Sequence, residues 1–279
     1  MKIGFIGGGR MCASFCQYLR GCPVSITGVL TKDILYTNFA QRVINIDVLT
    51  PFLQECDIVF LTVKDDGIRP LAQDIAQSGA VIDGCVFCHM SGSLSSDALS
   101  PLQGSRGLCA FHTMTSLTGG PVDFSKVICT LQGTGAGEEA LKEFSSIANL
   151  TVISIKKEDK LLYHAASCFC ANFILPLIDA AKNIYCDIGF SEPDAYALML
   201  PLLSQVLENL KQNGTAKALT GPFSRGDCDT VRKHIADLEK REPAYAGLYR
   251  NMGRLTAAFS AENGIISAEK KDELDKILK

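Results

Sequence analysis

The sequence lacks a strong charge of either sign, a long apolar run and a low-complexity tract. Its 279 residues carry a net charge of −3, so we expect neither the basic face that nucleic acids attract nor one that suits an anionic membrane. The richest apolar stretch, residues 161–184, is interrupted by polar side chains before it reaches the roughly 20 apolar residues of a membrane span. The first apolar run, residues 3–6, ends in glycines and does not resemble an export signal. These absences predict a cytoplasmic protein without nucleic-acid or membrane partners.

Cysteine, in contrast, is plentiful, with twelve residues. Without an export signal we interpret them as reduced thiols that pack as small hydrophobic side chains. One spacing, Cys85-Val86-Phe87-Cys88-His89, matches the pattern at which haem is attached. Residues 80–89 are predicted to form a strand, however, and positions three apart on a strand point to opposite faces. We therefore expect neither haem nor a metal there.

The first half of the chain alternates between strand-like and helix-like patterns. Strands are predicted at residues 2–6, 24–30, 57–63, 80–88, 108–112, 126–132 and 151–155, and helices at residues 10–20, 68–77 and 137–148. This alternation predicts an α/β fold with a doubly wound, mostly parallel Rossmann sheet and right-handed crossovers.

The second half shows no convincing strand after residue 155. Residues 157–185 are apolar on nearly every side, which favours a helix buried in a domain core or a subunit interface. Capping residues and a proline predict further helix starts at Ser191, Asp227, Pro243 and Ser267. We therefore expect two domains, a dinucleotide-binding domain at residues 1–156 and an all-helical domain at residues 157–279, which would contact substrate and form a homodimer.

The first predicted strand runs through glycines into the first predicted helix. In the fingerprint Gly-x-Gly-x-x-Gly, the first glycine allows a tight turn and the second lets the backbone approach the diphosphate of a dinucleotide at the helix N-terminus. Cys12 replaces the third glycine, and its small side chain can still lie close to the strand. The predicted cofactor-binding residues of this turn are Gly7, Gly8, Gly9, Arg10 and Met11.

The end of the second predicted strand bears on the choice of cofactor. An NAD site usually has an acidic residue there, which binds the ribose hydroxyls. This chain instead reads Thr31-Lys32, and no acid comes before Asp33. A hydroxyl and an ammonium group suit a 2′-phosphate, so NADP is favoured and NAD is the alternative. Lys32 as a solvated loop residue is the other interpretation.

Polar residues follow the ends of two predicted strands. Ser91 comes shortly after His89, and His112 ends the strand at residues 108–112. Ligands of open parallel sheets bind beyond the carboxyl ends of the strands. Both segments therefore lie at the edge where a site is expected, although each histidine alone is as readily a structural group.

A polar stripe crosses the apolar segment that follows. Lys160, His164, Cys168 and Asn172 recur every four residues and so lie along one helix face. Polar groups on an apolar helix need partners, which a ligand or an interface can supply. Pro176 cannot donate to the Asn172 carbonyl, so we expect the helix to open or kink there.

The segment at residues 219–227 is predicted to be a tight loop with a hydroxyl, a guanidinium and a carboxylate. Arg225 is suited to bind a substrate carboxylate through two parallel hydrogen bonds. Asp227 is better placed to cap the next helix. The alternative is a structural connector with a surface arginine.

Together these motifs resemble a bacterial family of Rossmann-like proteins whose C-terminal half is a domain of unknown function. The resemblance covers nearly the whole chain and rests on the glycine turn, His89-Met90-Ser91-Gly92-Ser93, Tyr163-His164-Ala165-Ala166 with Asn172, and Thr220-Gly221-Pro222-Phe223-Ser224-Arg225-Gly226-Asp227 with His234. Two residues depart from the family pattern. Thr113 and Lys64 stand where proline is usual, and Lys64 adds a charge to the loop with Val63 that the resemblance places near the nicotinamide.

The family is similar to pyrroline-5-carboxylate reductase, prephenate dehydrogenase and 6-phosphogluconate dehydrogenase. The likeness implies hydride transfer between NADP and a small carbonyl, imine or hydroxy compound. It implies His112 as a general acid or base and Ser91 as a hydrogen-bonding partner of the reacting oxygen. It also implies that His164 and Asn172 face the substrate. A dinucleotide-binding sensor or assembly protein without catalysis is the alternative, because fold does not determine function.

Overall fold

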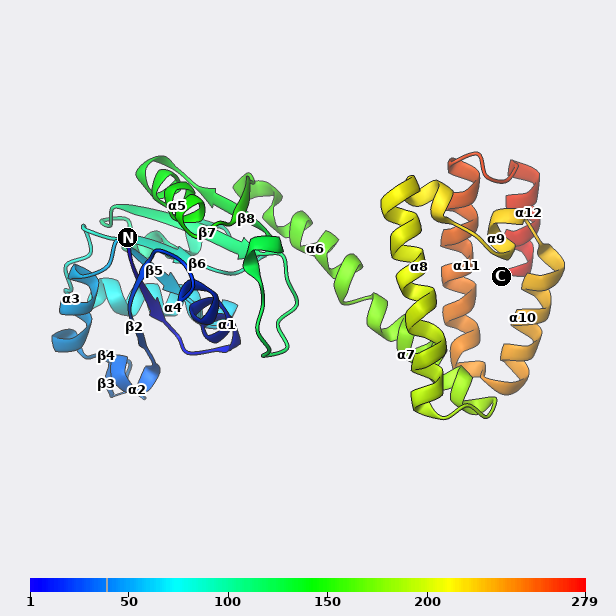
Figure 1. Ribbon diagram of the computed structural model, residues 1–279, viewed down its shortest axis with the longest axis horizontal. Helices are drawn as coiled ribbons and strands as arrows, with labels where there is room; N and C mark the ends of the chain where they lie inside the picture. Colours follow the sequence, from blue (N-terminus) through cyan, green and yellow to red (C-terminus); the bar gives the residue numbers. More distant parts are fainter. Residues whose placement is uncertain (39) are drawn as a thin grey trace. The chain divides into compact units, whose positions relative to one another are not determined.

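The structure is a computed structural model that describes residues 1–38 and 40–279. The chain divides into two compact units, Met1–Asn172 and Phe173–Lys279 (Figure 1). The boundary expected at residue 156 follows the last strand, whereas this division lies one helix later, after α6 (Lys160–Ala171). The first unit therefore contains the whole large sheet together with α6.

The first unit is built around a seven-stranded sheet in the order β2-β1-β5-β6-β7-β8-β9. All neighbouring strands are parallel except β7 and β8, which confirms the predicted Rossmann architecture. The strands are β1 (Lys2–Ile6), β2 (Ser25–Leu30), β5 (Ile58–Leu61), β6 (Val86–His89), β7 (Gly107–Thr113), β8 (Ile128–Gly133) and β9 (Thr151–Ser154).

One predicted strand is too long and one region has elements that the sequence did not predict. The strand expected from residue 80 begins only at Val86, because Asp83 and Gly84 form a turn before it. Residues 31–56 form α2 (Lys32–Leu35), a small hairpin of β3 (Tyr36–Asn38) and β4 (Val43–Ile44), and α3 (Ile46–Gln54). These elements are short, so their hydrophobic periodicity is weak.

The core fills both faces of the sheet. On one face, α1 (Arg10–Leu19) and α5 (Gly135–Ile147) pack on a group of phenylalanines centred on Phe15. The ring of Phe15 contacts the rings of Phe5, Phe60, Phe111, Phe124 and Phe144. On the other face, α3 and α4 (Asp65–Gln77) cover a second apolar cluster.

The two cysteines of the haem-like spacing lie in different clusters, Cys88 on one face of the sheet and Cys85 on the other. This confirms the prediction that they point apart. The described part of the chain contains no group of three or more histidine, cysteine or acidic side chains placed to hold a metal ion.

The second unit is helical throughout the residues described. It contains α7 (Ile174–Asp187), α8 (Glu192–Ala218), α9 (Pro222–Arg225), α10 (Cys228–Arg241), α11 (Pro243–Glu262) and α12 (Ala268–Ile277). The predicted starts are confirmed by three caps. Side chains of Ser191, Asp227 and Ser267 accept hydrogen bonds from backbone N–H groups in the first turns of α8, α10 and α12.

The apolar segment at residues 157–185 differs from expectation in its burial. It opens between α6 and α7, at Asn172, as the missing donor of Pro176 predicts. The most apolar part of this segment has no buried residue. The prediction that the segment is a helix buried in a domain core is therefore wrong. Lys157–Asp187 is long and apolar enough to count as a possible membrane span by length and composition, contrary to the sequence estimate. The break interrupts the helical hydrogen bonds, while Asn172 and Phe173 keep right-handed helical φ and ψ angles.

Candidate functional site

The glycine turn after β1 has a backbone that only glycine adopts without strain. Gly7 has φ +110°, and a Cβ there would lie 2.9 Å from the backbone of Thr62 and Val63. The turn is held by the Gly7 N–H, which donates to the Leu30 carbonyl at 2.9 Å, and by the Thr62 hydroxyl, which donates to the Gly7 carbonyl at 2.6 Å. The first glycine of the fingerprint therefore serves the fold itself.

The N-terminus of α1 has the features of an anion site. Gly9 precedes the helix with no side-chain cap, and the first turn contains no acidic residue. A Cβ at Gly9 would approach only the Thr62 carbonyl oxygen, at 3.7 Å, so the fold does not require a glycine there. The N–H groups of a first helical turn have no partner within the helix and attract negative charge. The residues present therefore fit a dinucleotide diphosphate.

The predicted partners of the ribose end lie beside this turn. Thr31 is close enough to Gly8 that a Cβ on the glycine would lie 3.2 Å from the Thr31 methyl carbon. Lys32 is the first residue of α2, directly after Thr31, and Asp33 follows it with an exposed side chain. The structure thus places a hydroxyl and an ammonium group at the end of β2.

A cavity of about 520 Å³ begins at the same helix N-terminus. Arg10 and Met11 line it from α1, and Val63 lines it from the end of β5. His112 from β7 and His164 from α6 line it as well. All of its lining residues belong to the first unit. Lys64, the residue before α4, is not among them.

Two of the predicted catalytic residues meet across one glycine. The ring centroids of His112 and His164 are 6.2 Å apart. A Cβ on Gly92 would lie 2.6 Å from Cδ2 of His164 and 2.9 Å from Nε2 of His112. Position 92 therefore needs a residue without a side chain so that the loop after β6 can pass the two imidazoles.

His112 has a second partner, which the sequence did not single out. Its Nδ1 lies 2.8 Å from the hydroxyl oxygen of Tyr163, one residue before His164 on α6. Burial lowers the pKa of His112 to about 4, and the positive charges of Lys160 and His164 act in the same direction. The imidazole is therefore neutral at pH 7. Tyr163 stands in the quoted family motif, but nothing in the sequence pairs it with His112.

Ser91 lines the cavity, but its hydroxyl already has partners. It donates to the carboxylate of Asp65 at 2.6 Å and accepts from the backbone N–H groups of Ser93 and Leu94 at 3.2 and 3.1 Å. These bonds hold the loop after β6 and use the only hydroxyl proton. Asp65, in the first turn of α4, also lines the cavity. Sequence reasoning missed it, although its position after a buried strand was the available signal.

Lys160 was noted as part of the polar stripe but not as a site residue. Its side chain is 1% exposed, and its Nζ donates to the Ser91 carbonyl at 3.2 Å. Burial lowers its pKa to about 8. His89, the third histidine near this edge, is fully buried between the Ser95 carbonyl and the Ser91 N–H, and burial lowers its pKa to about 4. His89 is thus a structural group.

Two of the five predicted catalytic residues are not among the residues of the first unit that line the cavity. Asn172 is exposed at the end of α6, about two helical turns or 12 Å along the axis from His164. Arg225 lies in α9 of the second unit. Asp227 caps α10 by accepting from the N–H and hydroxyl of Thr230, as predicted. Contacts of Asn172 and Arg225 with substrate stay predictions.

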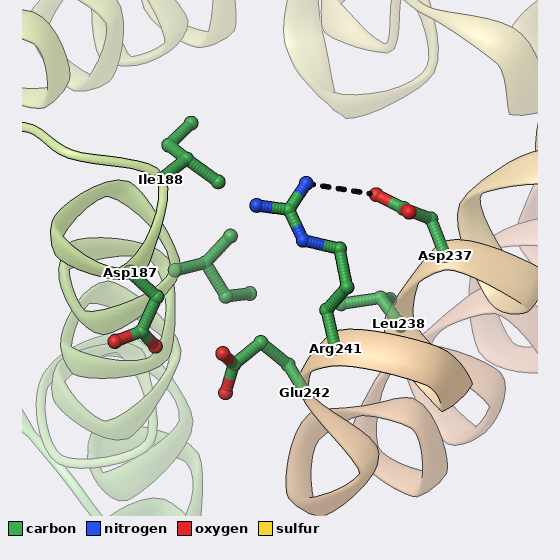
Figure 2. A pocket seen from close by; sticks show the side chains of 7 residues that line it. Asp187, Ile188, Asp237, Leu238, Arg241 and Glu242 are labelled. Carbon is green, nitrogen blue, oxygen red and sulfur yellow. Dashed lines mark ion pairs between the residues drawn. The ribbon is translucent and has the colours of Figure 1, made fainter.

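A smaller cavity of about 240 Å³ lies in the second unit between α7 and α10 (Figure 2). Figure 2 shows Arg241 reaching across it, paired with Asp237 at 3.5 Å, while Asp187 and Glu242 lie at its lower side. It offers neither a glycine turn nor a histidine. The cavity beside α1 therefore remains the candidate active site.

Comparisons with known families match two segments of the chain. Residues 1–112 match the Rossmann-like domain, and residues 127–256 match a domain of unknown function, DUF2520. The second match begins inside the sheet, because it includes β8, α5 and β9. The predicted family resemblance is confirmed. No curated protein matches the sequence.

Solved structures with the same fold cover nearly all of the chain. Protein TM1727 of Thermotoga maritima is 23% identical with a TM-score of 0.70, covering 94% of this chain and 99% of its own. A Bacteroides fragilis protein described as an NADP oxidoreductase is 18% identical with a TM-score of 0.71, over 92% and 98%. The pyrroline carboxylate reductase of Plasmodium falciparum, solved with NADP, is 14% identical with a TM-score of 0.59, over all of both chains. At these identities the likeness concerns the fold.

Proposed function

We propose that this chain, which joins a Rossmann-like domain to a DUF2520 domain, is an NADP-dependent oxidoreductase acting on a small carbonyl, imine or hydroxy compound. The proposal depends on one observation. The same cavity of about 520 Å³ is lined by the N-terminus of α1, which fits a diphosphate, and by His112 and His164, which can serve a reacting group. A dinucleotide laid on that helix would extend toward the histidines.

The chain would hold and orient the cofactor, which supplies the exchange of a hydride with substrate. The backbone at Gly8 and Gly9 and the first turn of α1 would bind the diphosphate. Thr31 and Lys32 at the end of β2 would bind the 2′-phosphate, which is why NADP is preferred over NAD. Val63, in the cavity wall, would pack against the nicotinamide side.

The lining of the cavity favours catalysis over passive binding. A sensor or assembly protein would lose nothing if apolar side chains filled the space beyond the dinucleotide. Here that space is open and carries Arg10, Asp65, His112 and His164. Ionisable groups gathered in a cleft are typical of active sites. Asp65 and Ser91 would keep the loop after β6 in place while His112 and His164 contact the substrate.

Calorimetry tests the cofactor first. The full-length protein should bind NADP(H) more tightly than NAD(H), and Gly9→Ala should weaken that binding without loss of folding, since its Cβ fits the protein. Gly120→Ala, in a loop where a Cβ would meet nothing within 4 Å, is the matched control. Absence of heat with either nucleotide would refute the proposal.

Catalysis is tested with a panel of carbonyl, imine and hydroxy compounds, followed by nicotinamide absorbance. His112→Ala and His164→Ala should each lower turnover, since general acid–base or polar contacts contribute roughly 100-fold or more. Full turnover by both variants on the same substrate would remove the proposed roles. Arg225→Ala should raise KM for substrates with a carboxylate only, if Arg225 binds that group.

The assembly is proposed to be a homodimer formed through the helical part of the chain. Large apolar side chains are exposed on α6 to α8, among them Leu161 and Leu162, which are 72% and 75% exposed, and Leu202 at 62%. Within each unit, several large apolar side chains exposed on one helix favour an interface. The same exposed segment, Lys157–Asp187, is also long and apolar enough for a membrane span, and the experiment below distinguishes a dimer interface from a span.

Sedimentation of the purified protein checks the dimer, and its behaviour without detergent checks the solubility that a cytoplasmic location requires. We expect a dimer in buffer without detergent, and Leu162→Glu should shift it toward monomer. Lys156→Glu, on an exposed residue near the same helix, is the control. A protein that requires detergent, or a monomer at micromolar concentration, would contradict this part of the proposal.

A further inference from the structure

Two side chains behind His112, Tyr163 and Lys160, have no part in the function proposed so far. Both come from α6, three residues apart, and both are packed into the first unit. Tyr163 is bonded to one nitrogen of the His112 ring, and Lys160 is bonded to the loop that passes the other nitrogen. Their positions determine which atoms His112 presents to the cavity.

Tyr163 determines the tautomer. Its hydroxyl oxygen is 2.8 Å from Nδ1 of His112, and the two rings are nearly perpendicular, at 85°. Burial raises the pKa of Tyr163, so its hydroxyl keeps its proton. A neutral imidazole has one nitrogen with a hydrogen and one without. The hydroxyl has a second acceptor, the Met114 sulfur, but at 4.0 Å against 2.8 Å for Nδ1. The nearer and stronger acceptor is Nδ1, and a hydroxyl that donates to Nδ1 leaves the hydrogen of His112 on Nε2.

The Nε2 edge of the ring lies beside Gly92, and both residues line the cavity. A Cβ added to Gly92 would lie 2.9 Å from Nε2 and 3.0 Å from Cε1 of His112, and Gly92 itself lines the cavity with both histidines. Because Gly92 has no side chain, the edge of the ring remains open to a ligand. The group offered to substrate is therefore an N–H donor.

Lys160 adds a positive charge at the base of the same site. It is 1% exposed and forms no ion pair with any residue that the structure describes. The ionisable groups that face it are Asp65 from α4, Cys88 and His89 from β6, and His112 from β7. The Asp65 carboxylate already accepts two hydroxyl hydrogen bonds. A buried ammonium without a paired acid is costly, which points to a functional reason for it.

We infer that Tyr163 and Lys160 are positioning residues that hold His112 as a neutral imidazole with its hydrogen on Nε2, and that the cavity therefore takes a carbonyl substrate rather than an iminium ion. This inference rests on the proposed oxidoreductase function. A carbonyl oxygen accepts the Nε2–H bond and gains negative charge as the reaction proceeds. An iminium nitrogen offers no lone pair and carries a positive charge, which Lys160 and Arg10 repel.

The reduction balances without any further reagent. The carbonyl carbon receives a hydride, so a C–H bond of the reduced nicotinamide breaks and a new C–H bond forms. The π pair of the carbonyl moves to its oxygen, where the His112 N–H and the Lys160 charge stabilise it. That oxygen would then take one proton from the solvent, which the overall reaction consumes, and His112 would keep its own hydrogen. The products are an alcohol and the oxidised nucleotide.

Nitrogen NMR of the full-length protein tests the state of His112 without any substrate. The chain has four histidines, and long-range spectra of protein labelled with ¹⁵N-histidine separate the tautomers. His112→Gln assigns the signal. We expect His112 to be neutral with its hydrogen on Nε2 from pH 8 down to pH 5, with and without NADP. A hydrogen on Nδ1, or a charged ring at pH 7, would overturn the inference.

Variants separate the two positioning residues. Tyr163→Phe should replace the single tautomer with a mixture, and Lys160→Met should raise the midpoint of His112 titration by about 1 pH unit by removing a nearby like charge. Lys156→Met is the exposed control. His234 is an internal comparison, since its Nδ1 lies 2.8 Å from the Tyr249 hydroxyl on the exposed surface. Tyr249→Phe should leave the His112 signal unchanged. Unchanged His112 signals in Tyr163→Phe and Lys160→Met would refute the positioning roles.

Turnover on matched substrates tests the choice of carbonyl. With NADPH, ketones or aldehydes should be reduced faster than the corresponding imines, and Tyr163→Phe should lower kcat more than it raises KM. Preference for imines would refute the substrate assignment while leaving the oxidoreductase function standing. Absence of NADP binding would instead refute the oxidoreductase function, whatever tautomer His112 has.

Discussion

Lys160→Met should make the protein more stable at neutral pH while it impairs the site. Burial lowers the Lys160 pKa from 10.5 to about 8. The protonated Lys160 side chain is therefore less favourable in the folded state than in the unfolded chain, where water solvates it. A gap of about 2.5 units, at 1.36 kcal/mol per unit, corresponds to about 3 kcal/mol of lost stability at pH 7. A methionine of similar length removes this penalty.

The substitution also has a cost, because the Ser91 carbonyl loses the Lys160 ammonium as a donor. An unsatisfied buried acceptor costs about 1–3 kcal/mol. The net expectation at pH 7 is a gain of about 1 kcal/mol. The stability difference between Lys160→Met and the wild type depends on pH. The unfolded lysine stays protonated up to about 10.5, whereas the folded one releases its proton near 8, so wild-type stability rises between these values and the advantage of the variant disappears.

Urea unfolding of both proteins at pH 7, 8.5 and 10 measures this difference directly. Lys156→Met is the control for loss of an exposed lysine. The reasoning is refuted if Lys160→Met is destabilising by more than about 2 kcal/mol at pH 7, or if its stability relative to the wild type does not change with pH.

Three further outcomes are expected. Gly7→Ala should destabilise the fold by about 1–3 kcal/mol, since its Cβ would clash with backbone at a φ of +110°, whereas Gly9→Ala should unfold like the wild type; equal thermal midpoints would contradict this contrast. Asp227→Ala should lower stability by about 1 kcal/mol through loss of the α10 cap. Guanidinium unfolding measures this loss, and an unchanged stability would contradict the role of the cap. Acid should destabilise the protein through His89, whose pKa is lowered to about 4. The unfolded chain binds this proton near pH 6.5, so about 3 kcal/mol is lost between pH 6.5 and 4. His89→Gln should flatten that loss.

The α/β architecture was predictable because its signals are local. Strands such as residues 2–6 and 108–112 agree closely with β1 and β7, since buried parallel strands read as continuous apolar runs. Capping residues at Ser191 and Asp227 predicted helix starts because a cap acts within one turn. Residues 31–56 could not be predicted in the same way. Their elements are too short for periodicity, and long-range bonds from Tyr36 and Arg42 to Asp74 tie the hairpin to α4.

The candidate site was predictable only in part. The glycine turn, Ser91, His112 and His164 stand in motifs or at strand ends, and the structure brings all of them to one region of the first unit. Asp65 and Tyr163 were missed as partners because each acts on a residue far away in the chain, on Ser91 and His112. Lys160 was predicted only as part of a polar stripe on a helix, because the sequence does not show that it is buried against the Ser91 loop.

The sequence by itself determined the order of the long strands and helices outside residues 31–56, the turn at Gly7 and the caps, because each depends on residues within a few positions of one another. Only the tertiary structure decided that the Ser91 hydroxyl is committed to Asp65, that Tyr163 bonds to His112 and that Lys160 is buried. Hydrogen bonds and desolvation depend on which groups meet across separate strands and helices, and spacing along the chain does not contain that information.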